Sequence, residues 1–257
     1  MNLLRLPLSC LGALALLASP PATYGQAQPV EPRVVERALW ITRWDWRGEA
    51  GLRKTIAQAA EAGFDTLLFQ VRGAASAFWR SDLEPRAAEL ADEPADFDPL
   101  AVALAVARAR GVALHAWVNV VPAWWGTEPP ADGAHLYHRK PEWFWYDEKG
   151  ARQPLCERFY VSLNPCLPEV RAYLAAVCAE IVERYAIDGL HLDYLRFPNE
   201  PPALPRGEAA RWPRDARTLE LFRSALGLQP DSAPAEWDRW RSEQVTELLR
   251  AIRLHVR

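Results

Sequence analysis

Polar side chains stand at the ends of four apolar segments of this sequence, a pattern typical of a shared site. They are Arg43 and Asp45; Gln70 and Arg72; His115, Trp117 and Asn119; and His191, Asp193, Tyr194 and Arg196. Burying a polar group without a partner costs about 1–3 kcal/mol, so such groups make poor core residues. Their positions instead indicate a place where a substrate is bound or altered.

Asp193 is the residue best suited to chemistry. A carboxyl between Leu192 and Tyr194, at the end of an apolar segment, can act as a general acid, a base or a nucleophile once its surroundings tune its pKa. We predict Asp193 as the catalytic carboxylate; the alternative is a structural ion pair with Arg196 or Arg72. For the other polar residues we predict substrate contacts, although an imidazole such as His191 can also serve to bond a neighbouring strand.

Aromatic residues gather between Val120 and Asn164, in a segment that we expect to be a long loop. Flat rings with polar edges suit the C–H faces of sugar rings. Trp124 and Trp125 are therefore predicted as sugar platforms, whereas the alternate spacing of Trp143 and Trp145 fits a packed strand equally well. The alternative for the whole group is a small core beneath the loop.

Alternating apolar patterns provide the elements that position these residues. Apolar spacing predicts strands at 37–43, 66–71, 112–118 and 189–195, and helices at 51–63, 98–111, 168–185, 218–226 and 235–255. The carboxyl ends of parallel strands meet at one edge of a sheet, which brings the polar groups together. Because strand side chains alternate in direction, we expect Gln70 and Arg72 to share one face, and His191 and Asp193 to share another.

The order of the elements predicts an α/β fold with a parallel sheet covered by helices. We expect residues 34–257 to hold the first four β/α units of a (β/α)₈ TIM-type barrel, truncated before strand five. An open doubly wound sheet is the rival architecture. The first strand is not followed by a Gly-rich phosphate turn, which argues against a dinucleotide fold.

Residues 1–25 have the pattern of a secretory signal peptide. Arg5 precedes an apolar run that ends near Ala18, and small residues and prolines follow. The run is too short for a comfortable membrane span. We expect cleavage near Gly25 or Ala27, a linker at 26–33, and a protein exported to the periplasm or the cell exterior without a stable membrane anchor.

Composition excludes some functions. A formal net charge of −3 argues against nucleic acid as a partner, which needs a basic surface. Of the cysteines outside the signal peptide, only Cys156 and Cys166 are placed so that a disulfide is sensible. His135 and His138 lack a third nearby ligand, so we predict neither a metal site nor a cofactor.

Four segments of this sequence resemble the glycosyl-hydrolase-like 10 family: Arg37-Ala-Leu-Trp-Ile-Thr, Phe64-Asp-Thr-Leu-Leu-Phe-Gln-Val-Arg72, Leu114-His-Ala-Trp-Val-Asn119 and Asp188-Gly-Leu-His-Leu-Asp-Tyr-Leu-Arg-Phe-Pro198. The family contains exported bacterial barrel proteins, with relatives that cleave peptidoglycan glycan strands lacking stem peptides. The resemblance implies that Asp193 is the catalytic carboxylate of strand four. It also implies that six residues line the sugar cleft, namely Gln70, Arg72, Trp117, Asn119, His191 and Arg196.

These observations together predict an exported glycoside hydrolase acting on a bacterial cell-wall glycan strand or a similar polysaccharide. Glycoside hydrolysis normally needs two carboxylates, and Asp45 is the other acidic residue that the sequence places near the site. The family's barrels continue into later strands, from which a partner for Asp193 would be expected. The alternatives are a non-catalytic glycan-binding module on a degenerate half-barrel and, third, a metal-dependent barrel hydrolase. The sequence does not indicate an oligomeric state.

Overall fold

The computed structural model describes residues 36–197 and 212–256. The predicted signal peptide and linker lie outside the described residues, as does Pro198 of the last motif. The chain divides into Met1–Val35 and Glu36–Arg257, and all of the structure below belongs to the second unit. None of the helices described in that unit is long and apolar enough to cross a membrane.

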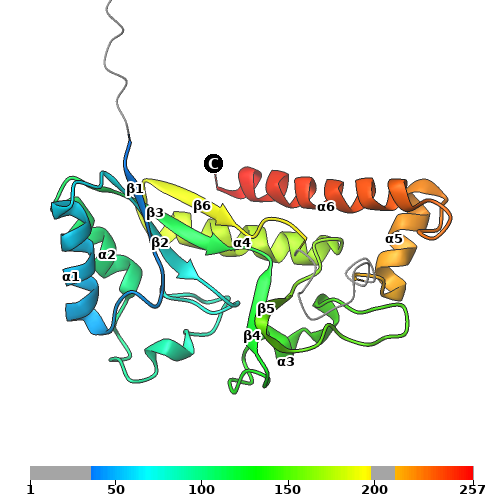
Figure 1. Cartoon of the computed structure of the whole chain (residues 1–257), viewed down its shortest axis with the longest axis horizontal. Helices are drawn as coiled ribbons and strands as arrows, with labels where there is room; N and C mark the ends of the chain where they lie inside the picture. Colours follow the sequence, from blue (N-terminus) through cyan, green and yellow to red (C-terminus); the bar gives the residue numbers. More distant parts are fainter. Residues whose placement is uncertain (1–35, 198–211, 257) are drawn as a thin grey trace, which may run out of the picture. The chain divides into compact units, whose positions relative to one another are not determined.

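The central sheet has four parallel strands in the order β1-β2-β3-β6 (Figure 1). They are β1 Ala38–Ile41, β2 Thr66–Arg72, β3 Ala113–Asn119 and β6 Gly189–Asp193. Each lies where the sequence predicts a strand, which confirms the parallel α/β arrangement. Strand β6 ends earlier than expected, because Tyr194 has a φ of 52° and cannot continue an extended strand.

Five longer helices accompany the sheet: α1 Gly48–Glu61, α2 Pro99–Arg108, α4 Pro168–Arg184, α5 Ala216–Leu226 and α6 Pro234–His255. The shorter helical elements are α3 Leu136–Arg139, η1 Ala88–Leu90 and η2 Pro141–Trp143. Helix α2 begins as predicted, with the Asp98 carboxylate accepting a hydrogen bond from the Ala101 amide at 3.1 Å and Pro99 in the first turn. Helix α6 packs along α4 (Figure 1), where Arg171 donates to the Gln244 side chain at 3.1 Å.

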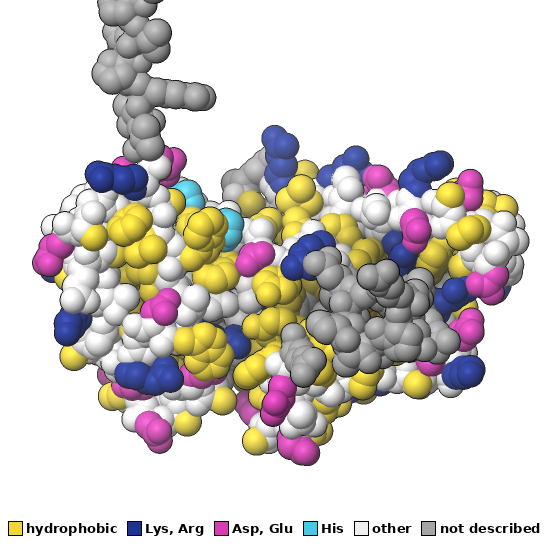
Figure 2. Space-filling view, in the orientation of Figure 1, with side chains coloured by type: hydrophobic (Ala, Val, Ile, Leu, Met, Phe, Trp, Pro, Cys, Tyr) yellow, Lys and Arg dark blue, Asp and Glu magenta, His cyan; other side chains and the backbone are white. Residues whose placement is uncertain are grey.

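The two faces of the sheet differ in their surroundings. Alternate residues of β2 and β3 are fully buried in the core shared with the helices: Leu67, Phe69, Val71, Leu114 and Ala116. The register aligns Trp40, Leu68, His115 and Gly189 on the opposite face, followed by Gln70, Trp117 and His191. Trp40 is 54% exposed there, and Figure 2 shows hydrophobic and histidine side chains side by side over the sheet. We call this surface the open face.

The segment expected to be a long loop contains a second sheet of two antiparallel strands, β4 Pro122–Gly126 and β5 Cys156–Ser162. The expectation of a loop is wrong here. Residues 127–155 separate the two strands, so no short turn marks them as a hairpin. Within that connection Trp145 is buried and donates to the Leu163 carbonyl at 2.9 Å, which makes it a core residue.

The buried cysteines, Cys166 and Cys178, contribute to the packing of the core. Cys166 is a buried free thiol, so it forms no disulfide with Cys156. Cys178 on α4 is also buried, and desolvation raises the pKa of its thiol to about 12. A thiol held in its neutral form by burial is unreactive, so Cys178 serves the core.

Candidate active site

The ends of β3 and β6 place two polar side chains side by side. Asn119 and Asp193 are register partners, so both project from the open face. Asp193 is half-buried; one of its carboxylate oxygens, Oδ1, accepts a hydrogen bond from the Tyr194 amide at 2.7 Å. Its backbone oxygen accepts another from the Val120 amide at 2.8 Å. The carboxylate is therefore fixed in position while part of it remains open to solvent.

His191 lies two residues before Asp193 on the same face, as predicted. The Trp40 indole nitrogen donates to His191 Nε2 at 3.2 Å. An indole N–H can only donate, so Nε2 is the acceptor in this contact. The ring of Trp117 meets His191 edge-on at 6.3 Å between centroids. Trp40, Trp117 and His191 thus form an aromatic wall next to the carboxylate.

Tyr194 turns the chain sharply at the end of β6. A positive φ of 52° at a non-glycine residue costs on the order of 1–3 kcal/mol, and such strain gathers at functional sites. The turn brings the Tyr194 ring to 5.6 Å from the ring of Tyr160 on β5. The exposed Arg196 guanidinium lies 4.9 Å from the centre of the Tyr194 ring.

Arg43, directly after β1, is buried with an exposed fraction of only 4%. Its guanidinium lies directly over Gly73, where a Cβ atom would stand 1.3 Å from Nη1. The Glu89 carboxylate approaches Nε to 3.1 Å without the alignment of a hydrogen bond, and the Trp44 ring centre is 4.5 Å from the guanidinium carbon. The Arg43 amide donates to Gln70 Oε1 at 3.1 Å, so Gln70 holds the backbone that carries this arginine.

Tyr160 joins Arg43 to the carboxylate end of the site. The charge of the Arg43 guanidinium acts on its hydroxyl, and the same Tyr160 ring contacts Tyr194, the residue after Asp193. Burial raises the pKa of Tyr160, and the positive charge of Arg43 opposes that rise. The sequence analysis missed Tyr160 because its strand fell within the expected loop.

A cleft of about 310 Å³ is lined in part by Arg43. Three tryptophans from two segments line it: Trp44 after β1, and Trp124 and Trp125 on β4. Its polar lining includes Arg43, Glu89 and His135. We call this cavity the tryptophan cleft. The structure thus brings the predicted platforms Trp124 and Trp125 together and adds Trp44 and Glu89, which the sequence analysis did not select.

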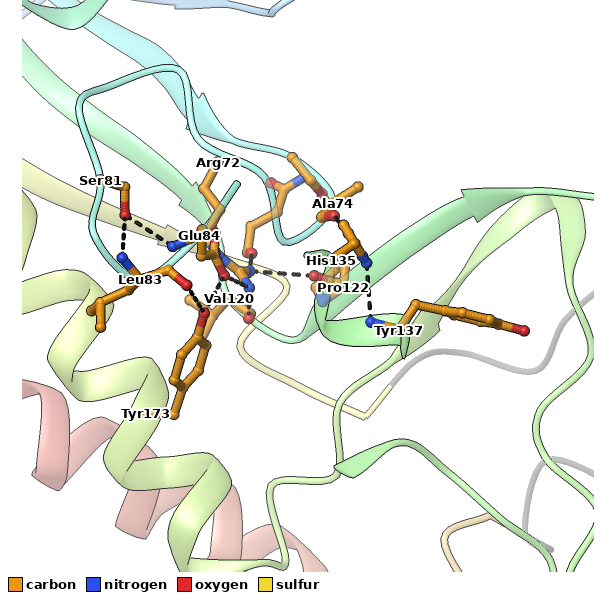
Figure 3. A network of polar contacts seen from close by, with 12 residues as sticks. Arg72, Ala74, Ser81, Leu83, Glu84, Val120, Pro122, His135, Tyr137 and Tyr173 are labelled. Carbon is orange, nitrogen blue, oxygen red and sulfur yellow. Dashed lines mark hydrogen bonds and ion pairs between the residues drawn. The ribbon is translucent and has the colours of Figure 1, made fainter. Parts of the chain in front are cut away.

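Arg72 does not share a face with Gln70, contrary to expectation. A register shift in β2 pairs Gln70 with Trp117 but Arg72 with Val118, so Arg72 points to the helix-covered side. There its guanidinium is fully buried and bonds Glu84 at 2.6–2.9 Å (Figure 3). It also donates to the carbonyls of residues 119, 120 and 122. With its donors engaged and no exposed surface, Arg72 is a structural residue, and the predicted substrate contact is wrong.

Other predicted contacts are also occupied within the protein. Asp45 is exposed, and its carboxylate accepts a hydrogen bond from the Thr42 amide at 2.6 Å, which closes the turn after β1. Asn119 is only 2% exposed and its amide lies 3.5 Å from the Gly73 carbonyl. Asp45 therefore shapes a loop, and Asn119 lies beneath the surface that Asp193 reaches.

Within residues 36–197 and 212–256, no group of three or more His, Cys, Asp or Glu side chains could hold a metal ion. His135 Nε2 lies 2.8 Å from the Ala74 carbonyl and His138 Nε2 lies 2.6 Å from the Pro130 carbonyl. Both histidines therefore bond the backbone. Burial lowers the pKa of His135 to about 4.

Comparison with known proteins gives a consistent result. The model of a family described as "Glycosyl hydrolase-like 10" matches residues 36–257. Glycosyl hydrolase DigH of Escherichia coli (strain K12) is 26% identical over 210 residues, which cover 72% of this chain and 46% of that protein. Glycosyl hydrolase YngK of Bacillus subtilis (strain 168) is 22% identical over 233 residues, covering 84% and 41%. The chain thus spans about half the length of the curated relatives it matches.

One solved structure supports the fold. Alpha-L-fucosidase isoenzyme 2 from Paenibacillus thiaminolyticus aligns with a TM-score of 0.56 at 16% identity, over 86% of this chain and 30% of that chain. At this identity the likeness concerns the fold alone. It relates the parallel sheet and its helices to a barrel glycosidase.

Proposed function

This chain belongs to the glycosyl hydrolase-like 10 family, and we propose that it is an exported glycoside hydrolase acting on peptidoglycan glycan strands or a similar polysaccharide. Family membership supports a glycosyl hydrolase-like function. The observation that carries the proposal is the half-buried Asp193 carboxylate at the carboxyl end of β6, beside the wall of Trp40, Trp117 and His191. Active sites of parallel barrels lie at this end of the strands.

Asp193 would either protonate the glycosidic oxygen or attack the anomeric carbon. Glycoside hydrolysis normally uses a second carboxylate, roughly 5–5.5 Å away for retention or 6.5–9.5 Å for inversion. Glu84 and Glu89 come from the neighbouring loop, but each is paired with an arginine, Arg72 and Arg43 respectively. Asp193 would therefore fill one of the two carboxylate roles. We do not assign the second role to Glu84 or Glu89, because both are ion-paired.

The surrounding residues would bind the sugar. The half-exposed rings near Asp193 offer apolar faces to a pyranose, and Tyr194 and Arg196 stand at its open side. Arg43 is too enclosed to meet the substrate near Asp193 directly. It would act there through its charge on Tyr160, whose ring contacts Tyr194.

A glycan-binding module without catalysis is the second candidate. It is favoured by the pairing of Glu84 and Glu89 with arginines and by the use of Asp45 in a turn, which among the described strand ends leaves Asp193 without a carboxylate partner for catalysis. Such a module would keep the aromatic surfaces and bind glycan without cleaving it.

Release of reducing ends from purified, peptide-free glycan strands separates the two candidates. Asp193→Asn is expected to lower the rate by about 10²–10⁴-fold, the usual contribution of an acid–base group. Asp238→Asn makes the same change at an exposed carboxylate on α6 and should leave the rate unchanged. Glycan binding without turnover in wild type and Asp193→Asn alike would overturn the hydrolase proposal in favour of the binding module.

A further inference from the structure

The tryptophan cleft is a second binding surface, distinct from the surroundings of Asp193. Arg43 and Glu89 line the cleft, whereas Asp193, His191 and Tyr194 are not among its lining residues. The volume of about 310 Å³ is at the lower end of ordinary ligand pockets, which span about 300–1,000 Å³. A space of this size suits a single sugar residue of a longer chain.

The tryptophan rings are fixed so that they present their faces. The Trp124 indole N–H donates to the Glu128 carbonyl at 2.7 Å, and the Trp125 indole N–H donates to the Glu157 carbonyl at 2.6 Å. Both polar edges are thereby occupied by the protein, while Trp125 remains 44% exposed and Trp44 50% exposed. Rings that are held by their edges and partly exposed are suited to stacking against a flat C–H surface.

The charged residues that line the cleft are balanced in sign. Two arginines and two acidic residues line it: Arg43, Arg86, Glu89 and Asp132. Arg43 is paired with Glu89, while the Arg86 guanidinium donates to backbone carbonyls of residues 90–97 at 2.9–3.4 Å. The Asp132 carboxylate accepts a hydrogen bond from the Ala134 amide at 2.8 Å.

The remaining titratable residue that lines the cleft, His135, is uncharged at neutral pH. Burial lowers the pKa of His135 to about 4, so its ring stays neutral. Within the described lining of the cleft, each cation is therefore already engaged by the protein. An anionic sugar would lose its hydration without gaining a free positive charge.

We propose that the tryptophan cleft is a subsite for an uncharged pyranose residue, and that Glu89 sets this preference by neutralising Arg43. The sugar stacks on the tryptophan faces, and its hydroxyls reach the Arg43–Glu89 pair at the polar end of the cleft. This inference rests on the proposed glycan-binding function and names the sugar class that the site accepts.

The test measures binding in the Asp193→Asn background, in which hydrolysis cannot consume the probe. The two probes are fully acetylated chitotetraose and its counterpart carrying carboxyl groups at C6, which share length and linkage. Titration calorimetry should give at least about tenfold tighter binding of the neutral probe, the effect of about 1.4 kcal/mol. Equal or tighter binding of the carboxylated probe would overturn the assigned preference.

Two variants test the residues. Trp125→Ala should weaken the neutral probe by about tenfold, whereas Trp125→Phe keeps a ring face and should stay within about threefold. Leu254→Ala on α6, at a side chain 67% exposed, serves as the control and should bind like the parent. Full-strength binding by Trp125→Ala would show that the sugar lies elsewhere.

Glu89→Gln tests the charge argument. Freed from its partner, Arg43 should attract the carboxylated probe, and the preference for the neutral probe should fall by about tenfold. The double variant Arg43→Met/Glu89→Gln removes both charges and should restore the preference, which separates a charge effect from a folding defect. An unchanged preference in Glu89→Gln overturns the role of Glu89.

The two proposals can fail separately. Glycan cleavage that depends on Asp193, without chitotetraose binding affected by Trp125, would overturn the subsite and leave the hydrolase standing. Binding that depends on Trp125, without any cleavage by the wild type, would support the subsite and overturn the hydrolase.

Discussion

Gly73→Ala should destabilise the protein through a steric clash between the new methyl group and the Arg43 guanidinium. Gly73 has no left-handed φ, so its backbone conformation accepts alanine. A Cβ atom at this position would stand 1.3 Å from Arg43 Nη1 and 2.4 Å from the guanidinium carbon. Two atoms cannot share that space, so the Arg43 side chain must leave its position between Gly73 and Tyr160.

The size of the effect follows from the contacts that Arg43 would lose. Driving the buried Arg43 side chain out of its packed position costs about 1–3 kcal/mol, and losing its stacking on Trp44 adds about 0.5–1 kcal/mol. The lower chain entropy of alanine in the unfolded state returns about 0.4–1 kcal/mol. The ion pair with the partly exposed Glu89 adds little. The free energy of unfolding should therefore fall by about 2 kcal/mol.

Urea unfolding of four proteins checks this reasoning: wild type, Gly73→Ala, Arg43→Met and the double variant. In the Arg43→Met background the collision is removed, so Gly73→Ala should cost less than about 0.5 kcal/mol. Gly51→Ala in α1, where nothing lies within 4 Å of the new methyl group, should stabilise the protein by about 0.5–1 kcal/mol. Equal losses from Gly73→Ala in both backgrounds would refute the assignment of the collision to Arg43.

Two further predictions concern pH and processing. Because burial lowers the pKa of His135 from 6.5 to about 4, the unfolded chain binds a proton first as the pH falls. The free energy of unfolding is therefore unaffected by this group above pH 6.5 and falls by about 3 kcal/mol between pH 6.5 and 4. In urea titrations at pH 7 and 4.5, His135→Gln should lack this part of the loss in stability. Equal losses of stability in the wild type and in His135→Gln would contradict the prediction. If residues 1–25 direct export, the mature protein should begin near Gly25 or Ala27 by mass spectrometry, and an exported chain that retains Arg5 would contradict the prediction.

Elements with a clean apolar pattern could be predicted to within a residue or two. Alternate residues of strands β2 and β3 are apolar, and their burial on the helix side stabilises both strands whichever residues stand on the open face. Helix α2 begins with the Asp98–Pro99 pair, which satisfies the free amides of its first turn locally. In both cases residues close together in the chain determine the element, so the element can be predicted from the sequence.

The parts that could not be predicted depend on distant partners. Tyr160 becomes part of the site only because β5 pairs with β4 and sets its ring against Tyr194. Glu89 lies on η1, whose place beside Arg43 depends on the long connection after β2. No spacing pattern in the sequence marks Tyr160 or Glu89 as a site residue, because the contacts that give each residue its role join segments far apart in the chain.

The bulge in β2 is the feature that leaves Asp193 available for chemistry. In a regular β2, Arg72 would lie on the open face with Gln70, close to the carboxyl ends of β3 and β6. An arginine there could hold the carboxylate in an ion pair, as Arg72 in fact holds Glu84. The shifted register sends Arg72 to the helix side instead, and Arg196 lies over the Tyr194 ring. Among the described residues, Asp193 therefore keeps only its backbone contacts with Tyr194 and Val120, an arrangement consistent with the catalytic role proposed for it.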